Sequence, residues 1–114
     1  MSRTRTDEVV TVAFVGAAPP ERAGAVHAFE TEVLRLMPTH GARVVFRGHR
    51  RAGQPTELPM EFHVLEFPTR AAYQAFLGDP RRAEVVERHG EVFTTKTVVE
   101  VEPILGDDPQ GERP

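Results

Sequence analysis

Two short stretches, Glu66-Phe67-Pro68-Thr69 and Gly78-Asp79-Pro80, decide how this chain folds. The first ends a β-rich run at a proline and then supplies a threonine suited to cap a helix. The second supplies a glycine that can end that helix, followed by an aspartate and a proline suited to the cap and first turn of another. Together they predict a strand followed by two capped helices in quick succession.

The segments on either side predict the remaining elements. Strands are expected where β-branched and aromatic residues gather, and helices where apolar residues recur every three or four positions. Capping residues, prolines and glycines mark the expected boundaries. The predicted strands are residues 8–16, 42–50, 60–67 and 91–103, and the predicted helices are residues 20–38, the segment between Thr69 and Gly78, and residues 80–89.

This order predicts an α+β fold of the ferredoxin-like type, β-α-β-β-α-β, with a four-stranded antiparallel sheet and its helices on one face. The other face of the sheet is then left uncovered, and its apolar residues need a partner. A second copy of the chain is the simplest partner, so we expect a symmetric homodimer with a cavity between the two sheets.

Length and composition limit the possible functions. The 114 residues predict one domain at residues 8–105, with flexible tails at 1–7 and 106–114. The absence of cysteine excludes disulfides, thiolate metal sites and cysteine nucleophiles. A net charge of -3 gives no reason to expect nucleic acid or an anionic membrane as partner. No apolar run is long enough to span a membrane and no secretion signal is recognisable, so a cytoplasmic protein is the expectation.

The candidate catalytic residues come from alternation along two neighbouring strands. Strict alternation places Arg43, Arg47 and His49 on one face of residues 42–50, and Glu61 and His63 on one face of residues 60–67. If these faces meet in the cavity, Glu61 can orient the imidazole of His63, which then acts as a general acid or base. The arginines and His49 would bind a carboxylate, phenolate or enolate of the substrate.

A structural interpretation stands beside each of these candidates. His63 and Glu61 can instead be a satisfied pair at the dimer seam, and the arginines can simply pair with Glu61 or a helix carboxylate. The sequence also leaves the register of the third strand open, because either residues 61, 63, 65 and 67 or residues 60, 62, 64 and 66 can face inward. A shift of one residue would remove the proposed base from the cavity.

Other titratable residues carry weaker predictions. Tyr73, the only tyrosine, lies on the packing face of its helix, where either core packing or a proton-donor role in the site is open. His27 and Glu30 lie beside the apolar stripe of the first helix, so we expect them at the margin of the core rather than in a site. Five scattered histidines without cysteines predict no metal centre.

The segments Gly41-Ala42-Arg43-Val44-Val45-Phe46-Arg47-Gly48, Glu66-Phe67-Pro68-Thr69 and Asp79-Pro80-Arg81-Arg82 resemble the dimeric α+β barrel superfamily. Within it, they resemble the uncharacterised domain-of-unknown-function family thirteen-thirty. The superfamily includes cofactor-independent quinol monooxygenases, muconolactone-type isomerases, polyketide cyclases, haem-dependent enzymes and proteins with no known chemistry. The resemblance therefore implies the fold firmly and the function loosely.

Three function classes follow. The first is a cofactor-independent enzyme that acts on a small, largely apolar or aromatic anionic metabolite by acid/base catalysis, as a cyclase, isomerase or monooxygenase. The second is a binding protein that uses the same cavity without turnover, and the third is a structural dimer with a filled interior. No cofactor is expected, although haem is an alternative that the resemblance leaves open.

Overall fold

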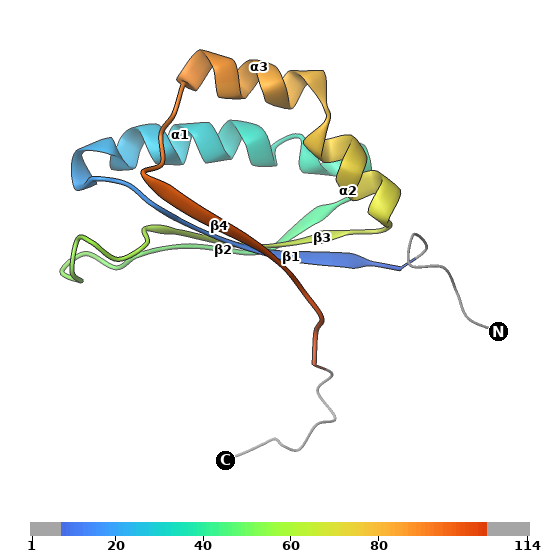
Figure 1. Cartoon of the computed structure of the whole chain (residues 1–114), viewed down its shortest axis with the longest axis horizontal. Helices are drawn as coiled ribbons and strands as arrows, with labels where there is room; N and C mark the ends of the chain where they lie inside the picture. Colours follow the sequence, from blue (N-terminus) through green and yellow to red (C-terminus); the bar gives the residue numbers. More distant parts are fainter. Residues whose placement is uncertain (1–7, 105–114) are drawn as a thin grey trace.

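A single four-stranded antiparallel sheet, with helices on one face, forms the body of the protein (Figure 1). The computed structural model describes residues 8–104, so the predicted tails at 1–7 and 106–114 lie outside the described residues. The strands are β1 (Val10–Ala17), β2 (Arg43–His49), β3 (Glu61–Phe67) and β4 (Thr95–Val101), arranged in the order β2-β3-β1-β4. The predicted ferredoxin-like α+β fold is confirmed.

The helical segments follow the predicted order, with one difference in length. They are α1 (Ala23–Leu34), α2 (Arg70–Leu77) and α3 (Pro80–His89), and α3 packs over α1 (Figure 1). The continuous helix predicted for residues 20–38 is wrong, because short 3-10 turns η2 (Pro20–Arg22) and η3 (Met37–His40) flank α1. A proline lies within each turn, and its missing N–H and fixed φ favour a break from regular α-helix.

The two stretches that decide the fold act as predicted. The Thr69 hydroxyl accepts a hydrogen bond of 3.0 Å from the backbone N–H of Ala72 at the start of α2. The Asp79 carboxylate accepts one of 2.8 Å from the N–H of Arg81 at the start of α3, where Pro80 holds the first helical position. These caps satisfy N–H groups that a helix start otherwise leaves without a partner.

The last strand is shorter than predicted. It begins at Thr95 rather than at Glu91, because Val92 and Phe93 are buried in the core before the chain joins the sheet. The ring of Phe93 contacts those of Phe14 and Phe29, with centroid separations of 5.4 and 6.3 Å. These apolar contacts hold residues 91–94 out of the strand and against the helical layer.

Directly paired residues in neighbouring strands share a face, so the register assigns every side chain of the sheet to one side. Residues 61, 63, 65 and 67 of β3 are buried beneath the helices, whereas residues 62, 64 and 66 are half-buried on the other face. Across the uncovered face runs an apolar row formed by Phe46, Val64, Ala13 and Val99. Of the two registers left open by the sequence, β3 adopts the one that buries Glu61 and His63.

Candidate active site

One buried carboxylate gathers three of the residues predicted from the sequence. The carboxylate of Glu61 lies 2.5 Å from Nε2 of His63, 2.7 Å from Nε of Arg47 and 2.8 Å from Nε2 of His49. Register explains this cluster, because Arg47 pairs directly with His63 and His49 pairs directly with Glu61 across β2 and β3. The predicted contact between the carboxylate and the imidazole is therefore present.

The location of this cluster differs from the prediction. Glu61 and His63 were expected to face a cavity on the uncovered side of the sheet, between two protomers. Both side chains instead lie on the opposite side, between the sheet and the helices, and both are buried within one chain. That expectation is wrong because the apolar residues that alternate with them, Phe62 and Val64, occupy the uncovered face.

Arg43 also lies elsewhere than predicted. A β-bulge at Val45 inserts one extra residue into β2, since Val44 pairs with Leu65 and Phe46 with Val64. The extra residue reverses the alternation, so Arg43 shares the uncovered face while Arg47 and His49 face the helices. Arg43 pairs there with Glu66 at 2.7 Å, and both side chains are exposed to solvent to a large extent. The shared face predicted for all three basic residues is wrong at Arg43.

Arg47 is held by several partners at once. Besides Glu61, its guanidinium donates to the hydroxyl of Thr31 at 3.1 Å and to the carbonyl of His27 at 3.3 Å. These contacts tie β2 to α1 and occupy all three guanidinium nitrogens. The geometry favours the structural interpretation of Arg47 over substrate binding, and the predicted binding role stays a prediction.

The charge of Glu61 follows from these contacts. Burial alone would raise the pKa of the Glu61 carboxyl, but hydrogen bonds from His63 and Arg47 outweigh it and hold that pKa below its usual range. An ionised carboxylate can only accept hydrogen bonds, so the nitrogen of His63 that contacts Glu61 must carry a proton. In the neutral imidazole that nitrogen is Nε2. The Nδ1 atom of His63 then keeps a lone pair, and this atom points towards Glu30 at 3.8 Å.

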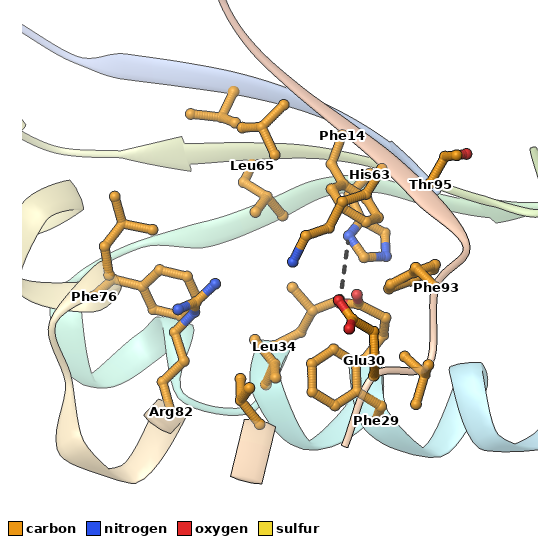
Figure 2. Close-up of a pocket in the computed structure, with 18 of the residues that line it drawn as sticks. Phe14, Phe29, Glu30, Leu34, His63, Leu65, Phe76, Arg82, Phe93 and Thr95 are labelled. Carbon is orange, nitrogen blue, oxygen red and sulfur yellow. Dashed lines mark ion pairs between the residues drawn. The ribbon is translucent and has the colours of Figure 1, made fainter. Parts of the chain in front are cut away.

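A cavity of about 430 Å³ opens beside His63, between the sheet and the three helices. Figure 2 shows His63 above Glu30 in this cavity, with the rings of Phe14 and Phe93 to one side and Phe76 and Arg82 to the other. The ring of Phe14 stacks on the imidazole, with centroids 5.0 Å apart. Tyr73 also lines the cavity and packs against Phe67, as the packing interpretation expects, and its predicted substrate-binding role stays a prediction.

Glu30 was expected at the margin of the core, and that expectation is wrong. Its side chain is buried and lines the cavity. Burial raises the pKa of the Glu30 carboxyl above its usual range, against the opposing effect of His63. Sequence reasoning missed this residue because Leu34, one turn after Glu30, is also buried, which widens the buried face of α1 beyond the predicted stripe.

Two cations that sequence reasoning did not select also line the cavity, Arg82 from α3 and Lys96 from β4. The Nε atom of Arg82 is buried and has no hydrogen-bond partner among the described residues. Its guanidinium carbon lies 5.5 Å from the centroid of the Phe76 ring. Arg82 was part of the quoted Asp79-Pro80-Arg81-Arg82 segment, but that segment was used for the superfamily resemblance and for a helix start, and no site role was given to Arg82.

His63 is the only histidine among the residues lining the larger cavity, where its Nε2 contacts Glu61 and its Nδ1 lies 3.8 Å from Glu30. The haem alternative stays an expectation of the resemblance. Within residues 8–104, no group of three or more His, Asp or Glu side chains has the arrangement of a metal site.

Comparison with solved structures places this architecture among known proteins. A protein of unknown function from Rhodopseudomonas palustris is similar over 87% of this chain and 85% of its own, with a TM-score of 0.66 and 19% identity. An uncharacterised NIPSNAP-like domain protein from Burkholderia xenovorans is similar over 90% of this chain and 91% of its own, with a TM-score of 0.67 and 16% identity. The chain shares their ferredoxin-like α+β fold.

A third structure with this ferredoxin-like fold is provisionally assigned as an antibiotic biosynthesis monooxygenase from Caulobacter crescentus. It is similar over 89% of this chain and 94% of its own, with a TM-score of 0.65 and 10% identity. No family model and no curated protein matches the chain. The superfamily resemblance is thus confirmed as a fold, and the narrower resemblance to family thirteen-thirty stays an expectation.

Within the described part of the chain, no helix combines the length and apolarity needed to cross a bilayer.

Proposed function

We propose that this protein binds a small, largely apolar or aromatic anion in the cavity and transfers a proton to or from it at His63. The observation that carries this proposal is the position of His63, whose imidazole is fixed by Glu61 on one side and borders a cavity of about 430 Å³ on the other. A base positioned in this way suits cofactor-independent isomerase, cyclase or monooxygenase chemistry. The fold shared with a provisional monooxygenase is compatible with it.

The residues divide the work as follows. Nδ1 of His63 takes a proton from a carbon or hydroxyl of the ligand, and the resulting imidazolium is stabilised by Glu61. Arg82 lies across the cavity and stabilises the enolate or phenolate that remains, because its buried Nε atom has no hydrogen-bond partner among the described residues. After exchange of its protons with solvent, the imidazolium returns a proton to another atom of the ligand, so an isomerisation consumes no other reactant.

The cavity walls select the rest of the ligand. Phe14, Phe29, Phe76 and Phe93 contribute apolar surface, which favours a planar or aromatic body. The volume lies within the range of roughly 300–1,000 Å³ that small-molecule sites occupy. A cavity of this size supports ligand binding over a purely structural dimer with a filled interior.

Binding without turnover is the second candidate, and the apolar cavity with its cations supports it equally. The two differ in what His63 does once a ligand is bound. A panel of phenolic and enolisable keto acids is screened by native mass spectrometry of the purified protein, and binders are then incubated in D₂O. Deuterium uptake at the acidic carbon, followed by NMR, reports proton transfer directly.

The variants His63→Gln and Arg82→Gln separate the roles, with Arg43→Gln on the far face as the matched control. We expect His63→Gln to keep affinity within about threefold and to lose about a hundredfold or more in deuterium uptake, as removal of a general base does. Arg82→Gln should weaken binding at least about tenfold, as loss of a charge-assisted contact does. Deuterium uptake at the wild-type rate in His63→Gln would refute the catalytic role of His63. Binding without turnover by His63 would then be the favoured function.

A further inference from the structure

The two carboxylate oxygens of Glu61 face two different histidines. Oε2 lies 2.5 Å from Nε2 of His63, and Oε1 lies 2.8 Å from Nε2 of His49. The three side chains come from adjacent strands, because His49 pairs directly with Glu61 and His63 follows two residues later on the same face. They form one continuous chain of titratable groups.

This chain runs from the interior to the surface. The side chains of His63 and Glu61 are 2% and 1% exposed, whereas that of His49 is 46% exposed. His63 lines the larger cavity, while Glu61 and His49 line a second depression of about 400 Å³ on the side of Pro20, Ala23 and His27. Glu61 therefore separates the two spaces and contacts a histidine that borders each.

We propose that His49 exchanges protons with solvent and passes them through Glu61 to and from His63. This inference rests on the proposed role of His63 as the proton-transferring group. After Nδ1 of His63 takes a proton from the ligand, its Nε2 gives one to Oε2 of Glu61. A half-turn of the carboxyl group exchanges its two oxygens, and the proton moves to Nε2 of His49 in its Nδ1–H tautomer. The resulting imidazolium releases its Nδ1 proton to water.

Because His63 is buried, its protons need a route to solvent, and the relay would supply that route. The cavity wall around His63 is mostly apolar, and the imidazole itself is almost fully enclosed, so direct exchange with bulk water is hindered. A buried base that must change its protonation state during reaction needs a route for that proton. His49 is suited to the outer position because an imidazole can accept a proton at one nitrogen and donate one from the other, and its side chain is 46% exposed.

The charged and titratable groups that face His49 come from three elements. Glu61 approaches from β3, the ring of His27 from α1 lies edge-on with centroids 5.3 Å apart, and Arg50 follows it in the chain and lines the same depression. Arg47 binds the same carboxylate from its other side. Among these, only His49 is both in contact with Glu61 and open to solvent to a large extent, since the Arg47 side chain is 21% exposed and that of His49 is 46% exposed.

The alternative is that His49 merely neutralises Glu61. To separate the two, the ligand-free protein is labelled with ¹⁵N, and the exchange of the His63 Nε2 proton with water is measured by saturation transfer between pH 5 and pH 8. The variants are His49→Gln, His49→Ala and, as a matched control on the same depression, His27→Gln. Backbone spectra confirm that each variant is folded.

We expect His49→Gln to slow this exchange at least about tenfold and to remove its titration near neutral pH, while His27→Gln leaves both unchanged. Added imidazole should restore fast exchange in His49→Ala by occupying the vacated position. Exchange in His49→Gln at the wild-type rate, or His49→Ala without response to imidazole, would overturn the relay. Because no ligand is present, this result is independent of the deuterium-uptake test of His63.

Discussion

Nε of Arg47 and Nε2 of His63 share a single oxygen atom, Oε2 of Glu61, at 2.7 and 2.5 Å. One buried carboxylate thus holds the proposed base and also the arginine that ties β2 to α1. Site geometry and sheet-to-helix attachment depend on the same group, so a change at Glu61 must affect both.

Replacing Glu61 with Gln removes the charge and keeps the size. We expect a loss of about 3 kcal/mol in the free energy of unfolding, because removing one partner of a buried ion pair leaves the others uncompensated. Urea denaturation at pH 7 measures it. The control is Glu66→Gln, which breaks the exposed pair with Arg43 and should cost less than about 1 kcal/mol. Equal losses in the two variants would contradict the central role of Glu61.

Replacing Glu30, unlike replacing Glu61, is expected to stabilise the fold at pH 7. A carboxyl whose pKa is raised in the folded state favours folding while it is protonated, and this contribution is lost as pH rises through the folded pKa. Glu30→Gln should therefore be more stable than the wild type at pH 7, and the difference should shrink as pH falls through the raised pKa towards the ordinary value of 4.5 and stay constant below it. Thermal unfolding across this pH range tests it. A variant that is less stable at pH 7 would show that the carboxylate is held by a stronger partner than His63.

Two glycines offer a matched pair of alanine substitutions. A Cβ atom at Gly16 would lie 2.5 Å from a ring carbon of Phe93, whereas one at Gly24, in α1, meets nothing within 4 Å. Gly16→Ala should destabilise the fold by about 1–3 kcal/mol through overpacking and push Phe93 away from the cavity wall. Gly24→Ala should stabilise it by up to about 1 kcal/mol through helix propensity. Denaturation of both, with near-ultraviolet spectra for the ring environment, checks the contrast.

A homodimer is expected because the uncovered sheet face exposes apolar residues. Phe46 is 55% exposed there and belongs to the apolar row with Val64, Ala13 and Val99. If two copies pack these faces together, Phe46→Glu should shift the native mass from dimer to monomer without unfolding the chain. Leu58→Glu, at another exposed apolar position in the β2–β3 connection, is the control and should leave the mass unchanged. A wild-type monomer at micromolar concentration would contradict the expectation.

Local signals were sufficient to predict the fold. Proline, glycine and capping residues act within a few positions, so the boundaries at Thr69 and Asp79 could be predicted from neighbours alone. Phe93 shows the limit of this reasoning. Its β-favouring type predicted a strand, but contacts with Phe14 and Phe29, distant in sequence, hold it in the core.

The site was predictable only in part, for a similar reason. Glu61 and His63 lie on one strand, so alternation alone brought them together. Arg82 and Glu30 come from two helices, and only the packing of α1 and α3 shows that both reach the cavity. Strict alternation also misplaced Arg43, because nothing in Val44-Val45-Phe46 distinguishes a bulge from regular strand.

The bulge at Val45 lets two arginines four residues apart in sequence, Arg43 and Arg47, lie on opposite faces of the sheet. Deleting that single valine would leave a regular ladder with the same pairs, so Arg47 and His49 would still lie beneath the helices and Arg43 on the far side. A relative that lacks the extra residue can therefore keep the entire Glu61 cluster while its two arginines are three positions apart instead of four.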